Sequence, residues 1–288
     1  MSIQSLDDII GVRNRATVLR RLRWIEDRLW WHGVLRRSEL VTRFGISPQQ
    51  ASQDIATYQQ VQAGFATLEP STKSYVRSAE GRALFPKDPF RWISEESAEN
   101  NNTVIPVDRL TAPTRRADPS VMAALITSYD LRQSLEINYQ SMSRDQPVSR
   151  VICPHHIVDT GNRYHVRAWD GLRGRFVDFV IGRILSAAPR PGYSWVDAVA
   201  DRLWEEHVEI VLAPAEWLSP AQRRVVELDY GMSQGRIAFP VRKALVTYVA
   251  ESLGILHEIR GDPEPERVRE LRCPNAADLA PFVPARSL

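Results

Sequence analysis

Apolar residues recur at helical spacing near the start of the chain. Four of them are three or four residues apart and would line one face of a long helix: Val18, Leu22, Ile25 and Leu29. Gly33 ends this pattern, and a short second helix is expected from Ser38 to Gly45. The opening segment therefore predicts two helices separated by a short connection.

A third helix is expected directly after this glycine. Ser47 is a candidate N-cap, and Pro48 suits the first helical turn, where a missing N–H costs nothing. The predicted inward face carries three residues, Ala51, Ile55 and Tyr58. The predicted outward positions are all polar and uncharged: Gln49, Gln50, Ser52, Gln53 and Thr57.

Two strand-like segments, 64–68 and 73–76, follow this helix and flank a Pro-Ser-Thr turn. That arrangement is typical of a β-hairpin. Helix, glycine-containing turn, helix and hairpin in this order predict a winged helix-turn-helix domain, with the hairpin as its wing.

The middle of the chain alternates between apolar and polar residues with a period of two, from about 135 to 184. Short antiparallel strands joined by tight turns predict a small barrel of the Sm or SH3 type. From about residue 200 the pattern changes between strand-like and helix-like segments, and we expect a β-α-β-β-α order. The predicted fold class is therefore α+β with several domains.

Changes of composition mark the expected domain boundaries in this chain of 288 residues. The winged helix-turn-helix is expected over 1–95, the barrel over 118–192 and the third domain over 200–288. The polar stretch at 96–117 contains an Asn run, which disfavours regular structure and predicts a linker.

Composition narrows the class of protein. The apolar fraction of 43% is ordinary for a globular protein, and the chain lacks the run of about 18 apolar residues that a membrane span needs. The N-terminal residues lack the apolar core of a signal peptide. The two cysteines, Cys153 and Cys273, form neither a disulfide framework nor a zinc motif. We therefore expect a cytoplasmic protein with no membrane partner, metal or other cofactor.

Charge is unevenly distributed, although the net charge is only +2. Residues 1–95 carry 14 Lys and Arg against 10 Asp and Glu, and nine of these arginines lie within 13–43. Residues 196–288 carry 11 basic and 15 acidic side chains. A basic segment at one end of a chain is typical of contact with a polyanion, although an exposed amphipathic helix gives the same count.

The outward face of the third helix has chemistry suited to DNA readout. In a helix-turn-helix, this helix lies in the major groove, where glutamine bonds adenine through two contacts and serine pairs with either kind of base pair. Arginines elsewhere would hold phosphates, and Lys73 in the wing is placed for a phosphate or minor-groove contact. The candidate DNA-binding residues are Arg36, Ser47, Gln49, Gln50, Ser52, Gln53, Thr57 and Lys73. The alternative is a polar helical hairpin that binds no nucleic acid.

A second candidate site lies in the middle of the chain. Arg163, His165 and Arg167 alternate along one predicted strand, so their side chains share a face. Guanidinium groups clamp phosphate and aromatic rings stack on bases, which predicts a pocket for a nucleotide or nucleic acid. The candidate ligand-binding residues are Tyr139, Ser141, Arg150, His155, Arg163, Tyr164, Arg167 and Arg183. The alternative is that the tyrosines belong to the core and the arginines only solvate one face of the barrel.

Two other functions stay open. An enzyme is disfavoured because the chain has no GxGxxG, P-loop, HExxH or GxSxG motif, and a metal site at His155, His156 and Asp159 would lack a fourth ligand. The main alternative is a protein that binds single-stranded RNA or DNA through an Sm-like barrel and recognises no operator.

The string INY…SRVICPHHIVDTGNRYHVRAW…RFVDFVIGRI resembles a WYL domain, a regulatory module named for a Trp-Tyr-Leu triplet. Arg163, Tyr164 and His165 stand at that triplet, so only the tyrosine is retained. The order of winged helix, WYL domain and C-terminal extension resembles WYL-family repressors. The RYHVRAW and ISPQQASQDI segments are most similar to the BrxR/CapW group, which controls phage-defence operons such as BREX and CBASS.

This resemblance covers nearly the whole chain and implies a function. It implies a homodimer that binds an inverted repeat in double-stranded DNA and represses transcription until a nucleic-acid or nucleotide ligand reaches the WYL pocket. The C-terminal extension would then serve dimerisation and relay the ligand state.

Overall fold

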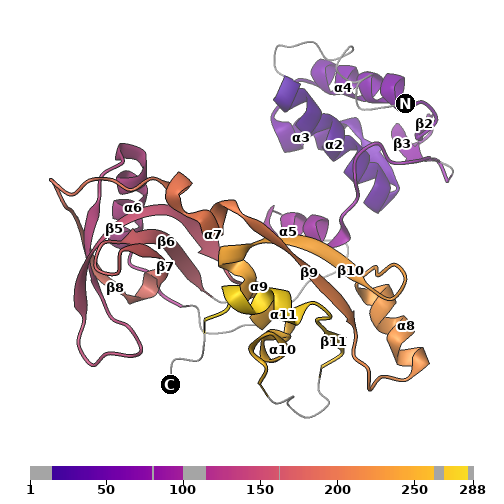
Figure 1. Cartoon of the computed structure of the whole chain (residues 1–288). Coiled ribbons are helices and arrows are strands. Elements are labelled where there is room, and N and C mark those ends of the chain that lie inside the picture. The colour runs from indigo at the N-terminus through magenta and orange to yellow at the C-terminus, as the bar shows by residue number, and fades with distance from the viewer. Residues whose placement is uncertain (1–14, 80, 100–114, 162, 263–268, 285–288) are drawn as a thin grey trace. The chain divides into compact units, whose positions relative to one another are not determined.

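The computed structural model describes most of the chain (Figure 1). The described residues are 15–79, 81–99, 115–161, 163–262 and 269–284. They form two compact units, Met1–Thr111 and Ala112–Leu288, and each unit is presented by itself. The Asn run of the predicted linker lies outside the described residues, whereas residues 96–99, also predicted to belong to it, are helical.

The first unit consists of helices and a small antiparallel sheet with strand order β1-β3-β2 (Figure 1). Its described elements are α2 (Arg15–His32), β1 (Val34–Arg36), α3 (Arg37–Phe44), α4 (Pro48–Val61), β2 (Ala66–Glu69), β3 (Ser74–Arg77) and α5 (Pro89–Glu99). The three predicted helices and the predicted hairpin are confirmed. Strand β1 and helix α5 were not predicted.

Local chemistry fixes the turn between α3 and α4. Gly45 has a φ of +62°, the left-handed conformation in which glycine is favoured at the end of a helix. Two residues later, the Ser47 hydroxyl accepts a hydrogen bond from the Gln50 N–H at 3.1 Å, and Pro48 opens α4. The helix-turn-helix geometry is therefore set within a few residues of sequence.

Helices α2, α3 and α4 enclose one apolar core. The predicted inward residues of α4 are buried, as are Leu22, Ile25 and Leu29 of α2, while Val18 is partly buried against the same core. The members of this core are Leu22, Ile25, Leu29, Leu35, Leu40, Ala51, Ile55, Tyr58, Val61, Phe65, Ala66 and Phe85. This packing holds α4 against α2 and leaves the polar face of α4 outside.

Two buried carboxylates reinforce the packing of α4 on α2. Asp54 accepts hydrogen bonds from the Arg21 guanidinium at 2.6 Å and 3.1 Å. Glu26 is fully buried on α2 and accepts a hydrogen bond from the Tyr58 hydroxyl at 2.7 Å. It also accepts the backbone N–H groups of residues 84 and 85, at 2.8 Å and 2.9 Å, and lies 2.8 Å from the Lys87 ammonium.

The second unit begins with helix α6 and a five-stranded antiparallel sheet of order β7-β6-β5-β4-β8. The bounds are α6 (Pro119–Leu131), β4 (Leu135–Tyr139), β5 (Val148–Asp159), β6 (Tyr164–Asp170), β7 (Arg175–Val180), η1 (Ile181–Arg183) and β8 (Ile184–Pro189). The predicted closed barrel is wrong. A short 3₁₀ turn, η1, connects β7 to β8, and within the described part of the chain these two edge strands do not pair, so the sheet is open.

The two faces of this sheet have different coverings. One face packs its apolar residues, including Ile137, Val166 and Phe179, against Val121 and Leu125 of α6. A register shift in β5 between Pro154 and His156 leaves His155 as an extra residue opposite β6. Ring contacts of both His155 and His156 with Trp204 show that the shift turns these neighbouring histidines to the other face.

The C-terminal part contains a second antiparallel sheet, of order β10-β9-β11. The bounds are η2 (Ala198–Ala200), α7 (Arg202–Glu205), β9 (His207–Pro214), α8 (Pro220–Asp229), β10 (Ile237–Arg242), η3 (Lys243–Leu245), α9 (Val246–Leu253), α10 (Leu256–Arg260), β11 (Leu271–Arg272), α11 (Ala276–Leu279) and η4 (Ala280–Phe282). The predicted β-α-β-β-α order is wrong in one respect. In the described residues, helices α9 and α10 separate β10 from the next strand.

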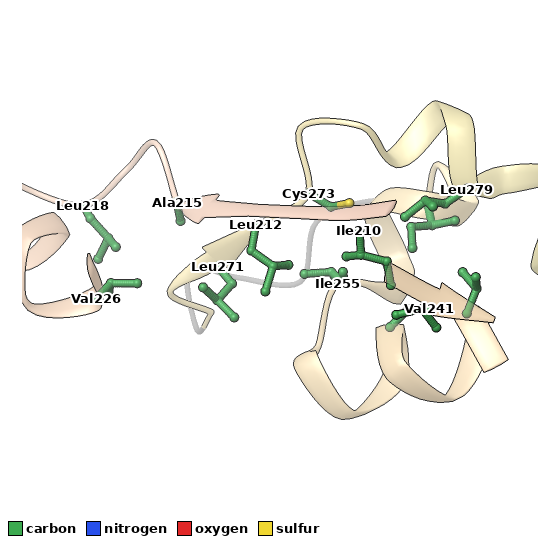
Figure 2. Close-up of a cluster of buried hydrophobic side chains, with 13 residues drawn as sticks. Ile210, Leu212, Ala215, Leu218, Val226, Val241, Ile255, Leu271, Cys273 and Leu279 are labelled. Carbon is green, nitrogen blue, oxygen red and sulfur yellow. The ribbon is translucent and has the colours of Figure 1, made fainter. Parts of the chain in front are cut away.

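Figure 2 shows how this C-terminal part forms its own core. Ile210 and Leu212 of β9 lie at its centre, between Val241 of β10 and Leu271 of β11. Helix α9 contributes Val246 and Ala250 to the same core. Strand β9 and helix α9 are thereby joined in one packed body.

We expect Asp54→Asn to destabilise the first unit by about 3 kcal/mol, because the buried Arg21 guanidinium would lose its charged partner. Chemical denaturation of the full chain, followed by tryptophan fluorescence, measures this loss. Glu95→Gln is the matched control, since it breaks the exposed Arg91–Glu95 pair on the same unit and should cause no measurable change. Equal effects of the two variants would contradict a structural role for Asp54.

Candidate nucleic-acid and effector sites

A groove of about 680 Å³ lies between the N-terminal end of α4 and the wing. Its basic lining residues are Arg36 and Arg37 at the start of α3 and Lys73 at the tip of the wing. Lys73 is exposed and holds a φ of +52°, which fixes the shape of the turn that carries it. The predicted DNA-binding residues Arg36, Ser52 and Lys73 therefore line one basic groove.

The outward face of α4 carries the predicted glutamines. Gln49 and Gln53 are exposed one turn apart on α4, and neither has a hydrogen-bond partner within the described ranges. Thr57 lies half-buried one turn further on. We call Gln49, Gln53 and Thr57 the polar ridge, and its glutamine amides point away from the protein core.

The other three candidates on α4 are engaged within the protein. Ser47 caps the helix, and the Gln50 side-chain amide donates to Asp54 at 2.9 Å. The Ser52 hydroxyl donates to the carbonyl of residue 48 at 3.0 Å and accepts from Arg37 at 3.2 Å. These contacts are made within the protein, and they hold the N-terminal part of α4 in place.

The count of arginines overstates the charge available on α2 for phosphates. Arg21 is buried against Asp54, and Arg28 donates to Glu39 at 2.6 Å. Arg20 and Arg23 lie over the rings of Phe44 and Phe85. Several of the arginines that suggested a polyanion partner therefore also stabilise the fold.

The eight predicted ligand-binding residues do not form one cluster. Tyr139 and Arg150 lie on the sheet face that packs on α6, where the Tyr139 ring contacts Phe179 and Arg150 pairs with the buried Asp170. Arg150 is only 4% exposed, and its guanidinium lies over the Phe179 ring. For these two residues the reading as core side chains is supported.

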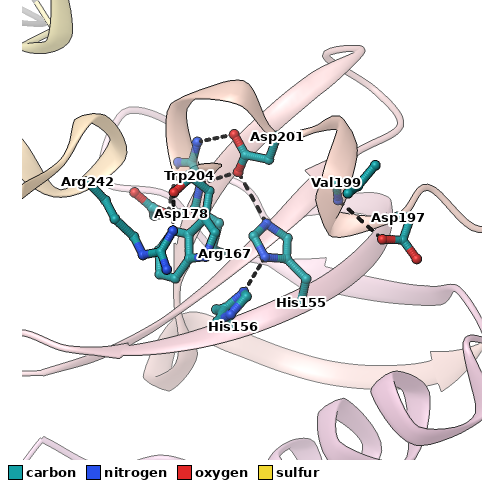
Figure 3. Close-up of polar contacts among 9 residues, drawn as sticks. All are labelled: His155, His156, Arg167, Asp178, Asp197, Val199, Asp201, Trp204 and Arg242. Carbon is teal, nitrogen blue, oxygen red and sulfur yellow. Dashed lines mark hydrogen bonds and ion pairs between the residues drawn. The ribbon is translucent and has the colours of Figure 1, made fainter. Parts of the chain in front are cut away.

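His155 and Arg167 lie on the opposite face, where they share one carboxylate (Figure 3). The Arg167 guanidinium donates to Asp201 at 2.6 Å and 3.1 Å, and His155 Nε2 lies 3.2 Å from the same carboxylate. Arg167 also donates to Asp178 on the neighbouring strand at 3.2 Å. Asp178 and Asp201 were not predicted, because sequence spacing does not indicate which carboxylates a fold buries.

Electrostatics fixes the charge state of this cluster. Burial of Asp201 opposes ionisation, but hydrogen bonds from His155 and Arg167 outweigh it and lower the Asp201 pKa to about 2. The His156 ring lies against Trp204, with ring centroids 4.3 Å apart and the planes tilted by 35°, and Arg242 of β10 lies over the same Trp204 ring (Figure 3). The sheet face and the C-terminal part are thus joined by buried charges and ring contacts.

A more open group of cations lies at the other end of β6. His165 is 6% exposed, and its Nδ1 has no hydrogen-bond partner within the described residues. Burial lowers the pKa of His165, and the charges of Arg163 and Arg183 lower it further. Arg163 and Arg183 are half-buried and form no ion pair with a carboxylate in the described part of the chain. We call Arg163 and Arg183, together with the His165 imidazole, which its lowered pKa leaves uncharged at neutral pH, the cation group.

The last two candidates lie near this cation group but differ in exposure. The Gln140 N–H donates to the Arg183 carbonyl at 3.0 Å, which brings the following residue, Ser141, close to Arg183. The Ser141 hydroxyl lies 3.3 Å from that of Ser143. Tyr164 is 52% exposed and, as the neighbour of His165 in a strand, points to the opposite face.

Two classes of feature are absent from the described residues. No helix there is long and apolar enough to cross a membrane. In the same ranges, no three His, Cys, Asp or Glu side chains come together in a way that would hold a metal ion.

Comparison with known proteins finds a matching domain family for each of the three parts of the chain. Residues 17–90 match the winged helix-turn-helix domain of the BrxR transcriptional regulator, and residues 120–189 match the WYL domain. Residues 207–278 match the C-terminal dimerization domain of the BrxR transcriptional regulator.

Whole-length relatives agree with these matches. The DNA-binding transcriptional repressor CapW of Stenotrophomonas maltophilia is 32% identical over 253 residues, which is 82% of this chain and 83% of that protein. CapW proteins of Pseudomonas aeruginosa and Escherichia coli are each 30% identical over 261 residues, 87% of either chain. The solved proteasome accessory factor B/C of Arthrobacter aurescens aligns with 93% of this chain and 45% of its own, at only 14% identity and a TM-score of 0.29.

The Asp201 cluster predicts a pH dependence. A carboxylate whose folded pKa is about 2, against an ordinary 3.8, stabilises the fold fully above its ordinary pKa and loses this contribution as the pH falls toward 2. Asp201→Asn should therefore unfold with a flatter dependence on pH between about 4 and 2 than the unchanged chain. Denaturation midpoints across that range measure the difference, and parallel profiles would show that Asp201 is not held ionised by its partners.

Proposed function

Because the chain belongs to the family of BrxR and CapW transcriptional regulators, we propose that it is a homodimeric, sequence-specific transcriptional repressor. The observation that carries this function is the polar ridge of α4 beside the basic groove of the wing. Glutamine amides supply base contacts, and the groove supplies cations for the flanking phosphates. Both halves of a DNA-binding surface are therefore adjacent in one unit.

The dimer follows from the C-terminal part. This segment matches a dimerization domain and has a hydrophobic core of its own. A two-fold dimer presents two copies of α4 related by the same symmetry, so its operator is an inverted repeat with half-sites spaced by the dimer. The relatives' names suit control of a phage-defence operon as the biological role.

The effector site is the cation group on the sheet of the WYL domain. Arg163 and Arg183 lack a carboxylate partner in the described residues, and the charges of both act on His165, whose buried Nδ1 is unsatisfied there. Guanidinium groups in that state suit a phosphate, as in a nucleotide or a nucleic-acid strand. Arg167 contributes by position, because its guanidinium is already bound to Asp178 and Asp201.

Base readout is tested on the polar ridge. We expect Gln49→Ala and Gln53→Ala each to reduce discrimination between operator and random duplex by about 1–3 kcal/mol, since each removes one base contact. Fluorescence anisotropy with a duplex from the region upstream of the chain's own gene gives both affinities in a salt series.

Gln60→Ala is the matched control for these variants. Gln60 is also exposed on α4, but it lies about three turns from Gln49, near the C-terminal end of the helix. In a helix-turn-helix, the N-terminal end of this helix contacts the bases. It should leave discrimination unchanged. Equal losses on both duplexes would contradict base readout by the ridge, and a preference for single strands over every duplex would support the single-strand-binding alternative.

The effector site is tested on the cation group. Arg163→Gln and Arg183→Gln should each weaken binding of a short single-stranded oligothymidylate by about tenfold, because each removes one charge-assisted contact. Arg190→Gln is the control, since it removes the same charge from an exposed residue at the far end of β8. Equal weakening by all three variants would show binding to general surface charge and would contradict the site.

A further inference from the structure

Helix α9 joins the cation group to the C-terminal core. Its residues Val246 and Ala250 are buried in that core, whereas Tyr248 lies on another face of the helix and contacts the WYL sheet. Because α9 is packed into the C-terminal part, a shift of the helix relative to the sheet must also move that part.

Tyr248 makes the specific contacts of α9 with the sheet. Its hydroxyl donates to Asp178 Oδ2 at 3.0 Å, and its ring lies against His165, with ring centroids 4.9 Å apart. The other oxygen of Asp178 accepts from Arg167, which in turn is bound to Asp201. A single tyrosine thus touches both a member of the cation group and the buried charge cluster.

A carboxylate beside this tyrosine would be repelled by an anion bound at the cation group. Asp178 accepts the hydrogen bond of the Tyr248 hydroxyl, and the Tyr248 ring lies against His165, so this carboxylate lies near the cation group. An anion held by Arg163 and Arg183 would add negative charge near this carboxylate. Like charges repel more strongly in a partly buried site than in water, so occupancy disfavours the α9 contact.

We propose that the Tyr248–Asp178 hydrogen bond is a latch that holds the C-terminal dimerisation part against the WYL sheet, and that an anion bound at the cation group releases it. This inference rests on the proposed effector site and names the element through which that site acts. Release moves α9 together with its core, and the spacing of the two DNA-binding units in a dimer depends on that part. Effector binding and operator binding are thereby coupled.

Tyr248→Phe tests the latch, because it removes the hydroxyl and keeps the ring beside His165. The measurement is the operator Kd of the full chain with and without saturating oligothymidylate. In the unchanged chain we expect the probe to alter this Kd by about tenfold. In Tyr248→Phe the ratio should fall below about threefold, and its operator Kd without probe should approach that of the unchanged chain with probe.

Tyr230→Phe is the matched control, since the Tyr230 hydroxyl lies in the same C-terminal part but is 3.5 Å from Glu270. It should retain the full response. If the unchanged chain responds and Tyr248→Phe responds equally, the effector site stands and the latch is overturned. If the unchanged chain binds the probe but its operator Kd does not change, the latch is overturned and the effector site stands; if it binds no probe, both fail. Greater amide hydrogen exchange in α9 of Tyr248→Phe would support release independently of any probe.

Discussion

A buried carboxylate must have a charged or hydrogen-bonding partner, and this constraint determines the arrangement of both units. In the first unit, Asp54 ties α4 to α2 through Arg21, and Glu26 does so through Tyr58. In the second, Asp201 holds Arg167 and His155 together. An unpaired charge in these places would cost several kcal/mol, so each pair allows only one packing of the elements that carry it. The orientation of α4 against α2, and of the sheet against the segment that carries Asp201, depends on these pairs more than on apolar contacts, because apolar contacts tolerate small shifts.

Local signals in the sequence predicted the first unit well. The cap at Ser47, the left-handed Gly45 and the apolar spacing along α2 act within a few residues, and the structure confirms all three. Helix α6 carries a similar signal, because Asp118 accepts the Ser120 N–H and Pro119 opens the helix, yet it was not predicted. The buried face of this helix is narrow, so the sequence pattern alone does not show that the helix packs against the neighbouring strands. The closed barrel was wrong because closure depends on pairing between distant edge strands, which alternation does not specify.

The predicted ligand-binding residues lie on two different faces of the sheet for a geometric reason. Side chains of a strand alternate between its faces, so Arg150 and His155, an odd number of residues apart, point in opposite directions. Because His155 is an extra residue in β5, its neighbour His156 points to the same face of the sheet as His155. In a regular strand, two neighbouring residues would point to opposite faces. The sequence pattern therefore did not indicate which of these side chains meet. Tyr248 and Asp201 could not be found in this way, because both come from segments outside the strands that define the domain.

The same limit explains why charge counts are a weak guide to function. An arginine that is paired with a carboxylate fixes shape, and an arginine without such a partner is available to a ligand, but both add one positive charge to the sequence. Arg21 and Arg167 belong to the first kind, whereas Arg163 and Arg183 have no carboxylate partner among the described residues. A regulator needs both kinds close together, since a ligand can change the fold only where its charge reaches groups that hold the fold. Tyr248 connects the two kinds, because its ring contacts His165 and its hydroxyl binds Asp178, the carboxylate partner of Arg167.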